Sequence, residues 1–197
     1  MRGISSGIRG LKKGTLRPSL VLLDDLQDAE SAENPEQVEK MLNIIKKDVM
    51  CLGGKDRLSI LQTATPICPE DLVEHIKADA NWKTTTYPGI ISFPKNNEMW
   101  DRYFKMYDLE LTTDSPHSGS LDFYRQNKKL MDEGAEVFNP TRFSLKDGHI
   151  SALQKMLELR HMIGNAAFAA EYQMQPMKYS FSLDIQPKTV LKRINGF

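Results

Sequence analysis

The chain has 197 residues, of which 40% are hydrophobic and 26% are charged, and its formal net charge is zero. These values are typical of a globular protein and exclude the strong overall field of a highly basic nucleic-acid or membrane binder. No apolar stretch approaches the roughly 20 residues of a membrane-spanning helix, and the first residues lack the apolar core of a signal peptide. The two cysteines have no CxxC or zinc spacing, so we expect a soluble, cytoplasmic protein without a membrane partner.

Charge is distributed unevenly along the first forty residues. Residues 1–18 carry five basic side chains and no acidic one, whereas residues 19–39 carry seven acidic side chains. Two interpretations remain open at this point. The charges can belong to solvated loops and helix faces, or a basic loop can face phosphate beside an acidic, metal-binding strand end.

The segment Leu20–Asp25 is the most informative feature of the sequence. Four consecutive apolar residues predict a strand that is buried on both faces, and two carboxylates, Asp24 and Asp25, follow at its C-terminal end. Ligands bind at this end of the strands in open α/β sheets, and Mg²⁺ uses one or two protein carboxylates together with water and phosphate oxygens. The pattern is typical of a Walker B motif, although acids also end strands without any catalytic role.

The following residues predict helices that alternate with strands. Asn34 and Pro35 form a typical helix start, and apolar residues then repeat with helical spacing until Gly53-Gly54. A second buried strand is expected at 58–61, and a helix is expected to begin at Pro69. A threonine-rich strand is then expected at 82–87. Strands that alternate with helices predict a mostly parallel sheet, and therefore an α/β fold.

From residue 96 onward the pattern is mainly helical. Asn96 can cap a helix with several aromatic residues, a second helix covers about 119–133, and a third runs from Leu153 to Pro176. The last twenty residues resemble a short strand and a connection. The aromatic residues of the first helix favour a buried core over a partner surface, because they share one face: Trp100, Tyr103, Phe104 and Tyr107.

Candidate site residues lie at the ends of the two buried strands. Asp24 is expected to hold Mg²⁺, and Asp25 to orient or deprotonate the attacking water. Thr63, Ala64 and Thr65 follow the second strand, so strand order can bring their hydroxyl groups close to Asp24 and a terminal phosphate. Taken alone, the Thr-rich segment is more typical of a turn before a proline.

A phosphate-binding loop is not found in the printed sequence. The segment Gly10–Thr15 contains the right residue types, but its lysines precede the glycine and a strand follows it, whereas a P-loop is GxxxxGK[ST] after a strand. Arg9 can contact a phosphate or DNA, although a solvated loop arginine is the better explanation of this residue.

Several short segments together resemble the large terminase subunit of tailed bacteriophages, the motor that packages DNA into capsids. The resemblance covers roughly residues 4–195. Its segments occur in the family's order: Gly7–Gly10, Arg17–Asp25, Asn34–Gln37, Thr63–Pro66, Tyr87–Ile90, Met99–Tyr103, Phe123-Tyr124, Met131–Ala135 and Phe168–Pro176.

The resemblance implies a partial RecA-like (ASCE) P-loop NTPase sheet that lacks the Walker A strand, followed by a mainly helical C-terminal part. Residues 1–95 correspond to the second half of the ATPase core, 96–177 to its helical remainder, and 178–197 to a linker toward the nuclease domain. Asp24 and Asp25 match the Walker B acids, and Thr63–Thr65 match the coupling motif.

The resemblance also implies cofactors and partners. These are ATP with Mg²⁺, double-stranded viral DNA, the portal protein and the small terminase subunit. Because the printed sequence lacks the phosphate-binding lysine, we expect a truncated or split subunit that does not bind its cofactors well or hydrolyse ATP alone, unless a separate chain supplies a Walker A motif. The alternative is a non-catalytic module that binds portal, small subunit or DNA.

Overall fold

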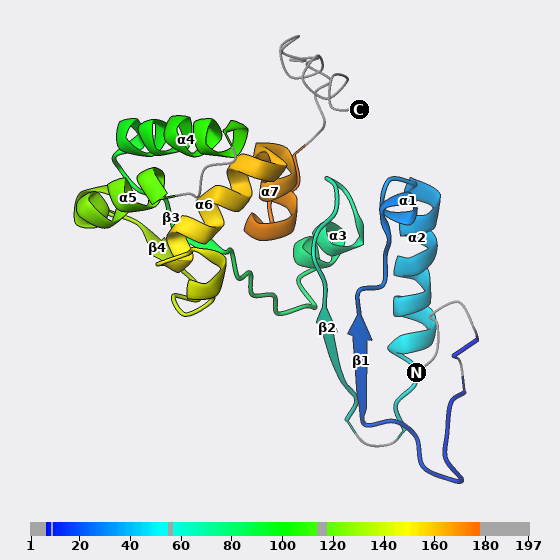
Figure 1. Ribbon diagram of the computed structural model, residues 1–197. Coiled ribbons are helices and arrows are strands. Elements are labelled where there is room, and N and C mark those ends of the chain that lie inside the picture. The colour runs from blue at the N-terminus through cyan, green and yellow to red at the C-terminus, as the bar shows by residue number, and fades with distance from the viewer. Residues whose placement is uncertain (1–6, 9, 55–56, 114–117, 178–197) are drawn as a thin grey trace.

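The computed structural model describes residues 7–8, 10–54, 57–113 and 118–177, and is a mixed α/β structure (Figure 1). An α/β part comes first in the chain and a mainly helical part follows. Arg9 and the expected linker 178–197 lie outside the described residues. The elements are β1 Leu20–Asp24, α1 Ala29–Ala32, α2 Pro35–Ile44, the π-helix η1 Ile45–Val49, β2 Ser59–Thr63, α3 Leu72–Ala78, β3 Ile90–Ser92, α4 Asn97–Thr112, α5 Ser118–Met131, β4 Glu136–Val137, the 3-10 helix η2 Leu145–Asp147, α6 Ala152–Ile163 and α7 Asn165–Gln173.

The first part contains a parallel pair of strands. β1 and β2 pair in register from Leu20 opposite Ser59 to Asp24 opposite Thr63, with α2 in the connection between them. The predicted third strand over 82–87 is wrong, because residues 83–88 have no regular secondary structure. A threonine-rich sequence favours extended backbone, but a strand also needs a neighbour with which to pair, and here the threonine side chains are exposed.

The prediction that β1 is buried on both faces is also wrong. Leu23 is only 7% exposed, whereas Leu20 and Leu22 are 55% and 65% exposed, and Leu61 on β2 is 56% exposed. Alternate residues of a strand point to opposite faces, so these three leucines share one face of the pair. Within the described residues, helices pack only against the opposite face of the strand pair. An apolar sequence does not show whether one face of a strand or both are covered.

Two hydrophobic clusters form the core. The first contains buried residues of β1, η1 and α3, with partly buried residues of α2 packed against them, and the second contains residues of β3 and α4 to α7. The aromatic residues of α4 belong to the second cluster, which confirms the core interpretation: Trp100 and Tyr103 are buried, and Phe104 and Tyr107 pack against them.

Helix boundaries follow the expected capping chemistry in most places. The side chains of Asn34 and Asn96 accept hydrogen bonds from the first turns of α2 and α4, as predicted. The helix expected from Pro69 begins later, at Leu72, because Asp71 caps it. The single helix expected from Leu153 to Pro176 is two helices, because Gly164 adopts a positive φ of 86° between them. No helix of the described residues is long and apolar enough to cross a membrane.

Candidate functional site

The ends of β1 and β2 bring two predicted site residues together. Thr63 and Asp24 are register partners on neighbouring parallel strands, and both side chains are exposed. The Thr63 hydroxyl donates a hydrogen bond of 2.6 Å to Asp24 Oδ1. The structure therefore places a carboxylate and a hydroxyl in direct contact at the C-terminal edge of the sheet, where α/β sheets bind ligands.

Asp25 occupies an unusual backbone conformation next to this pair. Its φ of 39° lies in the left-handed region, which asparagine and aspartate tolerate better than other residues with a Cβ. Its amide donates a hydrogen bond of 3.1 Å to the carbonyl oxygen of Thr63, which extends the pairing of the strands by one residue. Left-handed conformations of residues with a Cβ are concentrated at functional sites.

A buried carboxylate organises the loop that follows β2. Asp71 is fully buried, and its side chain accepts hydrogen bonds from the amides of Ile67 at 2.6 Å and Glu74 at 2.9 Å. Gln27, which follows β1, accepts a bond of 2.8 Å from the amide of Leu72. These contacts tie the loops after the two strands to the start of α3. Sequence patterns did not identify Asp71 or Gln27 as important, although an aspartate before an apolar run is a typical cap signal.

The remaining predicted site residues differ in their placement. Ala64 and Thr65 follow β2 directly and are half-buried, so they lie on the same chain segment as the Asp24–Thr63 contact. Their roles remain predictions. Arg9 lies outside the described residues, so its predicted contact with phosphate is not addressed by the geometry.

The Asp24–Thr63 pair fits Mg²⁺ as a partial ligand set. Carboxylate and hydroxyl oxygens are hard donors of the kind that Mg²⁺ prefers, and Mg²⁺ keeps several water or phosphate ligands in addition. Among the residues that the structure describes, no group of three or more His, Cys, Asp or Glu side chains could hold a metal ion. The pair can therefore contribute to a metal–nucleotide site but does not form a complete metal cage.

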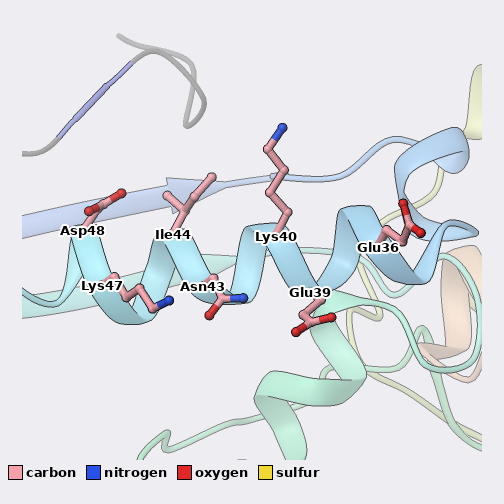
Figure 2. A pocket seen from close by; sticks show the side chains of 7 residues that line it. All are labelled: Glu36, Glu39, Lys40, Asn43, Ile44, Lys47 and Asp48. Atoms are coloured by element: carbon pink, nitrogen blue, oxygen red, sulfur yellow. The ribbon is translucent and has the colours of Figure 1, made fainter.

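A shallow depression on α2 and η1 does not resemble a catalytic site. Its lining side chains extend in different directions along one helical segment, as Figure 2 shows, and none belongs to β1 or β2. Both acidic and basic side chains line it, which is typical of a solvated helix surface. The lining residues are Glu36, Glu39, Lys40, Asn43, Ile44, Lys47 and Asp48.

A buried polar network in the helical part was not predicted. The Tyr103 hydroxyl donates a short hydrogen bond to Glu158, which is 7% exposed, and Gln154 Nε2 donates to the same carboxylate at 2.8 Å. His149 Nε2 lies 3.1 Å from the other carboxylate oxygen. Burial raises the pKa of Tyr103 well above its ordinary value, and the bond to Glu158 adds to that effect. This network packs against the second hydrophobic cluster and lies on different elements from the Asp24–Thr63 pair.

Comparison with known proteins gave no matching family model, no matching curated protein and no matching solved structure.

Proposed function

We propose that this chain is the Walker B and coupling part of a phage terminase large subunit, an ATP-driven motor that packages viral DNA. The observation that carries the proposal is the hydrogen bond between Thr63 and Asp24 at the ends of adjacent parallel strands. In nucleotide hydrolases, a carboxylate at this position binds the metal, and a neighbouring hydroxyl group can respond to the terminal phosphate. The segment resemblance described above supplies the family.

In this proposal each residue at the C-terminal ends of β1 and β2 has a separate role. Asp24 binds Mg²⁺, which neutralises phosphate charge when it is bound with ATP. Asp25 accepts a proton from the attacking water or orients it. Thr63, with Ala64 and Thr65, links the state of the nucleotide to the loop that Asp71 holds against α3, because that loop begins immediately after these residues.

The proposal also states what the chain requires. The printed sequence has no GxxxxGK[ST] segment, so the loop that binds the triphosphate must come from outside these 197 residues. The proposed fold is a RecA-like sheet whose Walker A strand is likewise supplied from outside these residues. The proposed partners are double-stranded viral DNA, portal protein and small terminase subunit in the cytoplasm of the host.

The test is complementation with a P-loop chain. The protein is co-expressed with a terminase fragment that ends in a strand and GxxxxGK[ST], and steady-state ATP hydrolysis by the purified complex is measured. We expect hydrolysis by the complex and none by either chain alone. Asp25→Asn should reduce kcat by about a hundredfold or more, the effect of losing a general base.

The controls separate the site from general damage to the fold. Asp24→Ala should abolish hydrolysis, Thr63→Ser should retain most of it because the hydroxyl remains, and Glu39→Gln on the exposed surface of α2 should have no effect. Two chains that stay separate and inactive would contradict the split enzyme. We expect the isolated chain to be inactive. ATP hydrolysis by the isolated chain, abolished by Asp24→Ala, would contradict this expectation.

The alternative function is a non-catalytic module that binds portal, small terminase subunit or DNA. The exposed leucine face favours it, because contiguous exposed apolar side chains can form a protein interaction surface. Retention of purified portal or small subunit by the immobilised chain, lost in Leu22→Lys, supports this function. Absence of retention argues against it.

A further inference from the structure

A pocket in the helical part is built from elements other than β1 and β2. Its walls come from the segment after β3, the first half of α4, the second half of α6 and the first residue of α7. Figure 1 shows these elements together in the helical part of the chain. The volume of the pocket is about 380 Å³, within the usual range of sites for small molecules.

Aromatic rings form much of the wall of this pocket. Phe93, just after β3, is 42% exposed, whereas Trp100 on α4 is buried. The ring of His161 stacks on Phe104, with centroids 4.3 Å apart and an angle of 10° between the planes. His161 Nε2 lies 2.8 Å from Asp108 Oδ1, and this contact holds the imidazole ring in place. A wall of this kind favours a flat ligand that can stack on it.

Arg160 is held in a defined orientation at the same pocket. Its guanidinium carbon lies 5.1 Å from the centroid of the Phe93 ring, a cation–π contact. Its Nε atom donates a hydrogen bond of 2.8 Å to Asn165 Oδ1. The terminal guanidinium nitrogens have no hydrogen-bond partner in the part of the chain that the structure describes. This planar fork is therefore free to bind a ligand that carries two adjacent acceptors.

Asp101 contributes the opposite charge. Its exposed carboxylate lines the pocket and has no ionic partner within the described ranges of the chain. The pocket therefore contains one unpaired anion and one unpaired cation. A free phosphate would face Asp101, and a simple cation would face Arg160. A neutral planar molecule with donors on one edge and acceptors on another satisfies both groups.

We propose that this pocket binds a guanine base. Guanine O6 and N7 accept the two N–H groups of an arginine fork, and the N1 and N2 groups on the neighbouring edge donate to the carboxylate of Asp101. The ring stacks on the aromatic wall, as unpaired bases do in other nucleic-acid sites. Adenine has an amino donor where guanine has O6, so Arg160 disfavours it. This proposal does not depend on the proposed enzymatic function.

The first test compares ligands on the unsubstituted full chain, so it does not depend on a variant that fails to fold. Isothermal titration calorimetry measures the Kd of guanosine monophosphate (GMP), adenosine monophosphate (AMP) and inorganic phosphate. We expect GMP to bind about tenfold or more tightly than AMP, and inorganic phosphate not to displace it. Absence of GMP binding at millimolar concentration overturns the proposal. Equal binding of both nucleotides, or displacement of GMP by inorganic phosphate, also overturns it.

Two variants with matched controls locate the site. Arg160→Lys keeps the charge but loses the fork, and should weaken GMP binding by about tenfold. Asp101→Asn should reduce the preference for GMP over AMP, because the amide presents a donor as well as an acceptor. The controls Arg142→Lys and Glu98→Gln change exposed residues that do not line the pocket and should leave the Kd unchanged. GMP binding that neither Arg160→Lys nor Asp101→Asn alters overturns the proposal.

A further titration identifies the source of the base. The probes are single strands of ten deoxythymidines in which one central position is replaced by deoxyguanosine or by deoxyadenosine. A guanine-containing strand that binds more tightly than both GMP and the adenine-containing strand identifies single-stranded DNA as the source. A guanine-containing strand that binds no more tightly than GMP identifies the free nucleotide. Both results support the guanine site.

Discussion

At the residue scale, the contact between Asp24 and Thr63 was predictable and its surroundings were not. Parallel strands end at the same edge, so the two apolar runs placed these residues at one edge of the sheet, and the structure shows that the two strands are neighbours. The supporting bonds of Asp71 and Gln27 depend on how the loops fold. Gln27 bonds Leu72, a residue 45 positions further along the chain, and no local pattern indicates such a pairing.

The buried tyrosines give a prediction at the same scale. Burial raises the pKa of Tyr103 and Tyr124, so the folded chain holds these protons more tightly than the unfolded chain. The stability that they contribute is complete below the ordinary tyrosine pKa of about 10, and is lost as the pH rises above it. We expect the urea midpoint to fall slightly from pH 8 to pH 9.5, because burial raises the pKa of the Cys68 thiol, and to fall steeply by pH 11.

Two variants identify the source of this alkaline transition. Tyr103→Phe should lower the free energy of unfolding at pH 8 by about 1.5–3 kcal/mol, because Glu158 loses a buried donor, and should make the fall above pH 10 shallower. Tyr87→Phe, at a tyrosine that is mostly exposed, is the control and should leave the pH profile unchanged. The same pH dependence of the urea midpoint in the unsubstituted protein and in both variants would contradict the assignment to Tyr103.

At the element scale, local chemistry predicted where helices begin better than where they break. Caps are local, so Asn34 and Asn96 could be recognised from a few residues. The break at Gly164 was missed because apolar spacing continues across it, although a glycine inside a helical pattern is a known signal. The prediction of a strand at 82–87 was wrong because a strand needs a neighbouring strand with which to pair, and residue propensity does not specify that neighbour.

Gly164 provides the prediction for this scale. Its φ of 86° and ψ of 163° fall in a region that is essentially restricted to glycine, while a Cβ at this position would meet nothing within 4 Å. Gly164→Ala should therefore destabilise the chain by about 1–3 kcal/mol through backbone strain alone. Gly54→Ala, where a Cβ would make ordinary contact with Arg17, is the control and should change the urea midpoint little.

At the scale of the whole molecule, the sequence predicted an α/β part and a helical part, but not how completely each would be covered. The two hydrophobic clusters share no buried residue, and each contains or contacts one of the two tryptophans. Trp82 packs against the first cluster and Trp100 is buried in the second. The coverage of the sheet could not be predicted, because an apolar strand has the same sequence whether one face or both are buried.

Separate clusters predict separate unfolding. We expect the fluorescence of Trp82, measured in Trp100→Phe, and that of Trp100, measured in Trp82→Phe, to follow transitions with different urea midpoints. Ile45→Ala should lower the free energy of unfolding of the first cluster by about 2–5 kcal/mol. Leu157→Ala should lower the free energy of unfolding of the second cluster by a similar amount. Each substitution should leave the other transition in place. Coincident transitions that shift together in both variants would show a single cooperative unit.

The bare face formed by Leu20, Leu22 and Leu61 has a consequence inside a cell. Proteins with exposed hydrophobic surface are bound by chaperones and degraded. Their abundance in the cell follows the fraction of molecules in which that surface is buried. In the proposed assembly, a partner that covers those leucines would lengthen the lifetime of the chain in the cell. The chain expressed without that partner would then be degraded faster than the assembled chain.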